Sequence, residues 1–215
     1  IKQSQDGNKT TIRTTKQQRG FGLMSKCVSS VKGMNDVLPK NISAWQQVEL
    51  ALKTVVQQFS FKEIRFPIVE KTELFKRSIG DLTDIVQKEM YTFEDLHNGD
   101  FLTLRPEGTA ACVRACEQNS LLYNQIQRLW YLGPMFRHER PQKGRYRQFH
   151  QFGVEAFGYD NVGIELELLS MNQKIWKALG LQDVVTLQIN TIGTVNERHQ
   201  YQAAAPTDAA RDRGW

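Results

Sequence analysis

The chain has 215 residues, of which 40% are hydrophobic and 24% charged, and this length can bury one well-packed core. No apolar run approaches the length of a bilayer span and no signal-like segment is evident, which excludes a membrane-spanning protein. The net charge of +5 comes from residues 1–30, because the rest of the chain holds 22 basic and 22 acidic side chains. The basic isoelectric point is therefore no evidence for a nucleic-acid-binding body.

The three cysteines, Cys27, Cys112 and Cys116, form no CxxC pair. Cys112 and Cys116 are four residues apart on an expected helix, so we expect core thiols and a reducing compartment. The four histidines lack the spacing of metal ligands, and no protein-bound metal is expected.

Residues 1–30 are polar and lack apolar periodicity, which predicts a disordered extension. Met24 is the expected natural start, so that the preceding residues are upstream or artificial sequence. A transit peptide is the alternative, although no Arg-rich amphipathic helix is evident. The globular pattern begins at Val31 and continues without a linker or repeat, which predicts one domain over 31–203.

A helix followed by a strand is expected at the start of this domain. Ser43 is a suitable N-cap, and apolar residues then recur at helical spacing. These residues are Trp45, Val48, Leu52, Val55, Val56 and Phe59. Residues 61–67 alternate as a strand, and Pro67 suits a sheet edge or the end of pairing because proline cannot donate to a ladder.

A β-hairpin is expected next, with strands at 90–93 and 101–104 around a turn that contains Asn98 and Gly99. The second strand runs into the sequence RPEGT (105–109), and a helix is expected from about residue 110. Glu107 and Thr109 could hold an ammonium group at this junction. The alternatives are a solvated acid and an ordinary N-cap.

The most informative segment is FRHERPQKGRYRQFHQ (136–151), which follows an expected strand at 129–132. It predicts a strand, a basic loop and a returning strand. Alternate residues of a strand share a face. One face of the returning strand holds Phe149, Gln151, Gly153, Glu155 and Phe157, and the other, mostly apolar, is the expected core side.

The first of these faces suits a nucleoside triphosphate on an antiparallel sheet. Phe149 can stack on a base, and Gly153 lets a ligand approach the backbone. Arg137 can fork onto a carboxylate or phosphate, and Arg145 can reach phosphates further out. The alternative is an exposed hairpin whose charged face is solvated.

A helix with its apolar face at Ile164, Leu168, Met171, Ile175 and Leu179 is expected to stop at Gly180. Trp176 on this helix is an expected core residue. Residues 184–189 predict a strand, residues 195–203 fit the start of a helix, and residues 204–215 form a tail without apolar periodicity.

Residues 136–151 resemble motif 2 of class II aminoacyl-tRNA synthetases and, over their full length, that of the histidyl-tRNA synthetases. Two further segments, VKGMNDVLP (31–39) at the start of the domain and RPEGT (105–109), resemble sequences of the same family. The resemblance implies an α+β fold, with helices flanking a largely antiparallel sheet, in the N-terminal part of the catalytic domain. It also implies a cytoplasmic protein and a homodimer built through residues 31–70.

The implied reaction is ATP-dependent activation of L-histidine, with Mg²⁺ on the triphosphate, followed by ligation to tRNA(His). By resemblance, Arg137 is catalytic and bridges the substrate carboxylate and the α-phosphate. Glu139 accepts from the adenine amino group, Phe149 stacks on adenine, and Arg145 holds the outer phosphates.

The resemblance assigns the histidine site to a second set of residues. Glu107, Thr109 and Gln151 hold the amino group, and Glu155 faces the imidazole. After residue 203 we find no stretch that resembles motif 3 or the family's Arg-Gly-Leu-Asp-Tyr-Tyr segment. We therefore expect the 215 residues to be inactive by themselves. Two alternatives are a regulatory paralogue that acts with a histidine-biosynthesis enzyme and a pure interaction fragment.

Overall fold

A computed structural model describes residues 28–80, 83, 85–190, 193, 196, 197 and 200, without the side chains of 86 and 87. The expected disorder of residues 1–27, the start at Met24 and the tail at 204–215 lie outside the described residues. Among the residues that are described, no helix combines the length and the apolarity needed to cross a bilayer.

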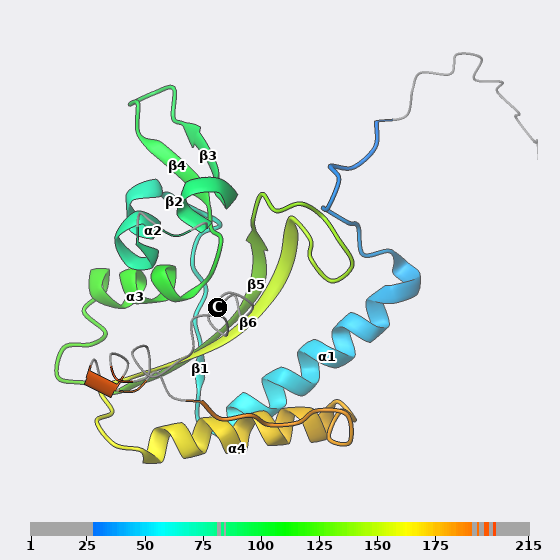
Figure 1. Cartoon of the computed structure of the whole chain (residues 1–215), viewed down its shortest axis with the longest axis vertical. Coiled ribbons are helices and arrows are strands. Elements are labelled where there is room, and N and C mark those ends of the chain that lie inside the picture. Colours follow the sequence, from blue (N-terminus) through cyan, green and yellow to red (C-terminus); the bar gives the residue numbers. More distant parts are fainter. Residues whose placement is uncertain are drawn as a thin grey trace, which may run out of the picture.

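Two three-stranded sheets form the frame of the structure (Figure 1). The first has the order β1-β5-β6, with β1 parallel to β5 and β5 antiparallel to β6. Its strands are β1 (Lys62–Glu63), β5 (Gln127–Phe136) and β6 (Gln148–Phe157). The two long strands confirm the expected hairpin around the basic loop.

The second sheet is antiparallel and has the order β2-β4-β3. Its strands are β2 (Val69–Lys71), β3 (Tyr91–Glu94) and β4 (Phe101–Leu104). The β3–β4 pair is the hairpin expected from the Asn98-Gly99 turn. Gly99 has a φ of 76°, which glycine adopts readily because it has no Cβ. The helices and sheets together confirm the α+β class.

Two long helices, α1 (Pro39–Gln58) and α4 (Gly163–Ala178), pack together against one face of the β5–β6 pair (Figure 1). The core between them buries Leu52, Val55, Val56, Phe61, Trp130, Met171 and Ile175. Phe152 and Val154 of β6 pack against this core, which confirms the apolar side of the returning strand. The apolar stripe of α4 is likewise confirmed.

The helix α3 (Thr109–Gln118) covers part of the opposite face, beside the shorter α2 (Thr72–Ile79) and a π-helical turn over Ile85–Glu89. Cys112 and Cys116 are buried there with Leu129, Tyr131 and Met135. Burial raises the pKa of the Cys112 thiol to about 12, so this thiol stays protonated at neutral pH. The prediction of core thiols is confirmed for these two cysteines.

An arginine joins α4 to the first sheet from the far end of β5. Arg128 donates through Nε to Tyr159 Oη at 2.6 Å and through Nη2 to Glu167 Oε2 at 2.7 Å. Its Nη1 also reaches the carbonyl of Phe59, directly after α1. This network ties β5, α1 and α4 together on the side away from the β5–β6 loop.

Three sequence-based expectations are wrong. The first helix begins at Pro39, not after Ser43, because proline at the first helical position has a suitable φ and needs no N–H partner. The strand expected over 61–67 is paired only at Lys62–Glu63, so its pairing ends before Pro67. Residues 184–189 form no strand, and Val184 and Ile189 are each 77% exposed.

Candidate active site

The candidate site lies on the face of the β5–β6 pair that α3 partly covers. Residues directly opposite one another in an antiparallel pair share a face. The register places Phe149, Gln151, Gly153 and Glu155 opposite Met135, Gly133, Tyr131 and Leu129, respectively. The alternation expected from the sequence therefore holds along β6, and these four residues lie in one row that continues to Phe157, opposite Gln127.

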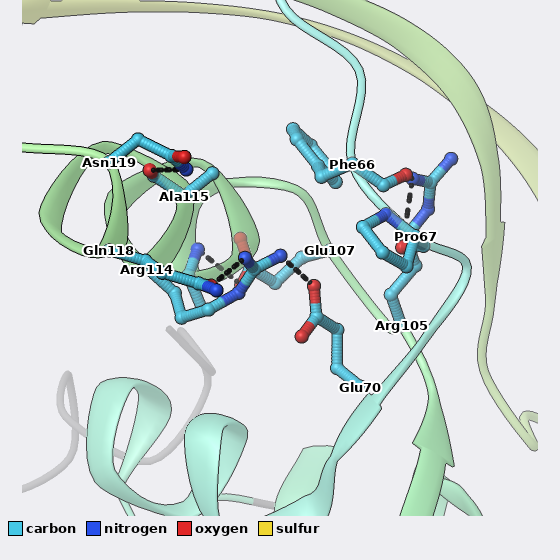
Figure 2. Close-up of polar contacts among 10 residues, drawn as sticks. Phe66, Pro67, Glu70, Arg105, Glu107, Arg114, Ala115, Gln118 and Asn119 are labelled. Atoms are coloured by element: carbon cyan, nitrogen blue, oxygen red, sulfur yellow. Dashed lines mark hydrogen bonds and ion pairs between the residues drawn. The ribbon is translucent and has the colours of Figure 1, made fainter. Parts of the chain in front are cut away.

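The RPEGT junction is brought to this row by Arg105, which sequence reasoning did not single out. Its side chain is buried and donates to the carbonyls of Phe66 at 2.8 Å, Pro67 at 3.3 Å and Pro134 at 2.9 Å. Figure 2 shows Arg105 reaching the backbone at Phe66 and Pro67. A Cβ on Gly133 would lie 2.5 Å from the Arg105 guanidinium, so β5 can pass close only because glycine stands there.

An ion pair holds α3 to β2. Arg114 on α3 donates to the Glu70 carboxylate, and its other terminal nitrogen donates to Gln118 Oε1 at 2.9 Å (Figure 2). Both partners of the ion pair are largely buried, which limits solvent screening of their attraction. The middle of α3 is thereby held against β2.

The side chain of Glu107, the residue before the N-cap Gly108, binds free N–H groups at the start of α3 and is not simply a solvated acid. Its Oε2 accepts from the Thr109 N–H at 2.5 Å, and its Oε1 accepts from the Ala110 N–H at 2.9 Å. A carboxylate at a helix N-terminus satisfies free N–H groups and complements the helix dipole. Glu107 therefore has a structural role that its assignment to an ammonium site did not include.

Replacing Glu107 with alanine is expected to lower the free energy of unfolding by about 1 kcal/mol, the usual contribution of such a cap. Urea denaturation followed by circular dichroism measures this value. Glu165→Ala is the matched control, because Glu165 lies exposed in the first turn of α4. Equal stability of the Glu107 variant and the parent would contradict the capping role.

Thr109 and Glu155 meet across the sheet face, as the histidine-site assignment requires. Thr109 Oγ1 donates to Glu155 Oε1 at 2.8 Å, so Thr109 is not the N-cap, a position that Gly108 occupies. Burial raises the pKa of Glu155, while the hydrogen bonds from Thr109 and Tyr131 lower it. The carboxylate is thus half-buried but supplied with donors.

The expected role of Gly153 needs correction. A Cβ at Gly153 would lie 2.3 Å from Cζ of Tyr131, and a Cβ at Gly108 would lie 2.2 Å from its Cε2. The space above both glycines is filled by the Tyr131 ring of the same chain. The space beside Gly153 is therefore occupied by the Tyr131 side chain and is not open to a ligand. The sequence pattern of β6 alone could not show this, because Tyr131 lies on the neighbouring strand β5.

Arg137 and Phe149 are brought together at the other end of the row. The Arg137 Cζ lies 5.2 Å from the centre of the Phe149 ring, and Arg137 Nε donates to the carbonyl of Pro106 at 2.9 Å. Because Nε makes this bond, the Nη edge of the guanidinium remains for a bound anion. β5 ends at Phe136, so Arg137 and Glu139 lie in the loop that follows the strand.

Glu139 and Arg145 face each other within the loop. Arg145 Nη1 lies 3.4 Å from Glu139 Oε2, yet this buried oxygen has no hydrogen-bond partner in the structure. We regard the contact as a charge attraction without hydrogen-bond geometry. The Glu139 side chain is 14% exposed and that of Arg145 65%, so the arginine is free to reach outward.

The loop is held by the segment around Gly33. The backbone N–H groups of Arg147 and Gln148 donate to the Gly33 carbonyl at 2.7 and 3.1 Å. Gly33 has a φ of 88°, and a Cβ there would lie 3.0 Å from side-chain atoms of Arg147 and Pro141. The VKGMNDVLP opening thus lies against the basic loop, a contact that no local pattern predicts.

Gln151 contributes an acceptor without a donor. Its Oε1 is buried and has no hydrogen-bond partner, like Oε2 of Glu139. A buried acceptor that lacks a donor costs free energy unless a ligand supplies one. Glu139 lies between Arg137 and Phe149 in the sequence and Gln151 follows Phe149 by two residues, so the site is suited to a ligand that donates at two places.

Comparison with known proteins identifies relatives over most of the chain. A profile of the histidyl-tRNA synthetase family matches residues 33–209. Histidine–tRNA ligase of Coxiella burnetii (strain CbuK_Q154) is 60% identical over 184 residues, covering 86% of this chain and 44% of that protein. Histidine–tRNA ligase of Legionella pneumophila (strain Philadelphia 1) is 60% identical over 176 residues, covering 82% and 41%. The chain spans less than half the length of these relatives.

Solved structures give the same picture. Apo histidyl-tRNA synthetase of S. aureus superposes with a TM-score of 0.59 at 39% identity, covering 72% of this chain and 40% of that chain. An ATP phosphoribosyltransferase regulatory subunit/histidyl-tRNA synthetase from Bacillus halodurans superposes with a TM-score of 0.62 at 22% identity, covering 72% and 39%. At that identity the second match supports the fold alone.

Proposed function

The chain belongs to the histidyl-tRNA synthetase family. From this premise we propose that the whole protein activates L-histidine with ATP and ligates it to tRNA(His). The observation that carries the proposal is the single row on the β5–β6 face. A guanidinium over an aromatic ring stands at one end, and a half-buried carboxylate with two hydroxyl donors stands at the other. Such a row can hold a nucleotide and an amino acid end to end.

The nucleotide half comprises the loop and the start of β6. Phe149 stacks on adenine, and the buried Oε2 of Glu139 accepts from the adenine amino group, which supplies its missing donor. Arg145, exposed beside Glu139, turns to the outer phosphates. Arg137 binds the α-phosphate and the substrate carboxylate through its Nη edge.

The amino-acid half comprises β6 and the start of α3. The ammonium group of histidine donates to Gln151 Oε1, whose buried lone pairs have no partner in the ligand-free protein. Thr109 and Glu107 lie at the same end and complete the ammonium site. Glu155 accepts the imidazole N–H, and an amino acid without that N–H leaves this half-buried carboxylate without the donor that the ligand supplies.

The reaction requires positioning and charge neutralisation more than covalent participation by the protein. A carboxylate oxygen of histidine attacks the α-phosphorus of ATP, and the bond to the bridging oxygen breaks as pyrophosphate leaves. Arg137 neutralises negative charge that builds on the α-phosphate. A ribose hydroxyl of the terminal adenosine of tRNA then attacks the histidyl carbonyl and releases AMP.

The proposal includes Mg²⁺ as an ion bound to ATP. Within the described ranges no group of three or more His, Cys, Asp or Glu side chains converges on a metal position. These residues therefore do not form a metal site by themselves, and we assign Mg²⁺ to the phosphate oxygens. No reaction step is derived through it.

The remaining partners are also proposals. Exposed apolar side chains at Val31, Val37, Leu38, Ile42 and Val48 support a homodimer formed through residues 31–70. We place the protein in the cytoplasm with its tRNA(His) partner. The regulatory alternative has weaker support, because the relatives named histidine–tRNA ligase are 60% identical and the match to a regulatory subunit is 22% identical.

The test is to measure ATP–pyrophosphate exchange with a protein that contains this sequence and has the full length of the curated relatives. Exchange that depends on L-histidine, and on no other natural amino acid to a comparable extent, is the expected result. Protein that binds a histidine-biosynthesis enzyme but catalyses no exchange would favour the regulatory alternative instead.

A further inference from the structure

Tyr131 is assigned no contact with a ligand in the proposed site, yet its hydroxyl lies beside the carboxylate that is proposed to bind the imidazole. Tyr131 Oη lies 3.4 Å from Glu155 Oε1, and Thr109 Oγ1 donates to the same oxygen at 2.8 Å. Within the described structure both of these bonds end on Oε1. We propose that Tyr131 is a positioning residue, which with Thr109 holds Oε1 of Glu155 so that Oε2 faces the substrate.

The ring of Tyr131 is held in place more firmly than a surface tyrosine would be. It is 3% exposed, and it contacts the Phe66 ring edge-on with centroids 5.2 Å apart. The ring packs directly against the backbone of Gly108 and Gly153, because a Cβ at either position would collide with it. Because a fixed ring has little freedom to swing away, its hydroxyl stays beside Glu155 at a constant position.

The electrostatic surroundings of Glu155 agree with this role. The titratable groups that face it are Glu107 and Tyr131 together with the thiols of Cys112 and Cys116. Burial raises the pKa of Tyr131 to about 12 and that of Cys112 to about 12, so both groups are neutral at physiological pH. The hydroxyl of Tyr131 is therefore a donor and not a competing anion.

The sign of the expected pH effect follows from these contacts. Hydrogen bonds from Tyr131 and Thr109 favour the ionised carboxylate and lower the pKa of Glu155, against the effect of burial. Removing the tyrosine hydroxyl removes one of these donors and raises the pKa. Glu155 then becomes protonated at a higher pH, and histidine binding weakens earlier as the pH falls.

The inference rests on the proposed function only for the identity of the ligand, so two measurements are needed. Carboxyl ¹³C NMR of glutamate-labelled full chain, with the Glu155 signal assigned by Glu155→Gln, gives the pKa without any ligand. We expect Tyr131→Phe to raise it by about half a unit to one unit. Calorimetric titration with L-histidine is expected to show weaker binding by about threefold to tenfold at pH 8, and more at pH 6.

Tyr159→Phe is the matched control. It also removes a tyrosine hydroxyl, but one that accepts a hydrogen bond from Arg128 on the opposite side of the sheet. It is expected to leave the Glu155 pKa and histidine affinity unchanged at every pH. Taking the ratio of variant to parent affinity cancels the titration of free histidine. An unchanged Glu155 pKa in Tyr131→Phe would overturn the positioning role, whereas a parent protein that binds no histidine would overturn the proposed function alone.

Discussion

Arg137→Ala is expected to lower the rate of histidine-dependent ATP–pyrophosphate exchange by at least about a hundredfold. The guanidinium is held by Pro106 O and the Phe149 ring, with its Nη edge directed to the proposed α-phosphate position. Removing one fixed donor from developing phosphate charge typically costs roughly 3–4 kcal/mol in the transition state. The rate constant should fall while the circular dichroism spectrum remains that of the parent.

Arg65→Ala is the control for this experiment. Arg65 pairs with Glu63 on the surface and its side chain is 85% exposed, so its loss removes an arginine without changing the proposed site. We expect near-parental exchange from that variant. If Arg137→Ala also retained near-parental exchange, its assignment as the catalytic arginine would be wrong.

Glu155→Ala is expected to weaken histidine binding by about tenfold to a hundredfold and to leave ATP binding nearly unchanged. A hydrogen bond to a charged group contributes roughly 1.5–3 kcal/mol, and this carboxylate lies on β6 away from the nucleotide half. Separate calorimetric titrations with L-histidine and with ATP measure the two affinities. The selective loss for one ligand is the informative result.

Two comparisons sharpen this prediction. Glu155→Gln keeps the shape and an acceptor oxygen but loses the charge, so an intermediate affinity is expected. Glu165→Ala removes an exposed glutamate from α4 and should change neither affinity. Equal losses of ATP and histidine binding in Glu155→Ala would show that Glu155 supports the fold instead of recognising the imidazole.

The sequence by itself determined the elements whose signals are local. The Asn98-Gly99 turn predicted the β3–β4 hairpin, and the apolar period with Gly180 predicted α4. Alternation along 149–157 identified which residues of β6 face the core and which form the site row, because side chains in a strand alternate with a period of two. The resemblance in 136–151 pointed to the family that the comparisons identify.

Other features depended on partners distant in the chain. The space beside Gly153 was predicted for a ligand but contains Tyr131, and only the register of β5 against β6 places that ring there. The β-branched run at 184–189 forms no strand, and composition alone does not ensure one because β-propensity depends on packing against neighbouring strands. Glu107 proved to be a helix cap, which depends on where the first turn of α3 begins.

Sequence patterns thus determined which faces are apolar and which residues could carry charge, since those properties follow from the periodicity of the backbone. Tertiary structure decided which side chains meet. Arg105 joins three carbonyls from segments about 30 to 40 residues away, and Gly33 holds the basic loop from more than 100 residues away. No local preference specifies such contacts, because they form only when separately folded segments pack into one core.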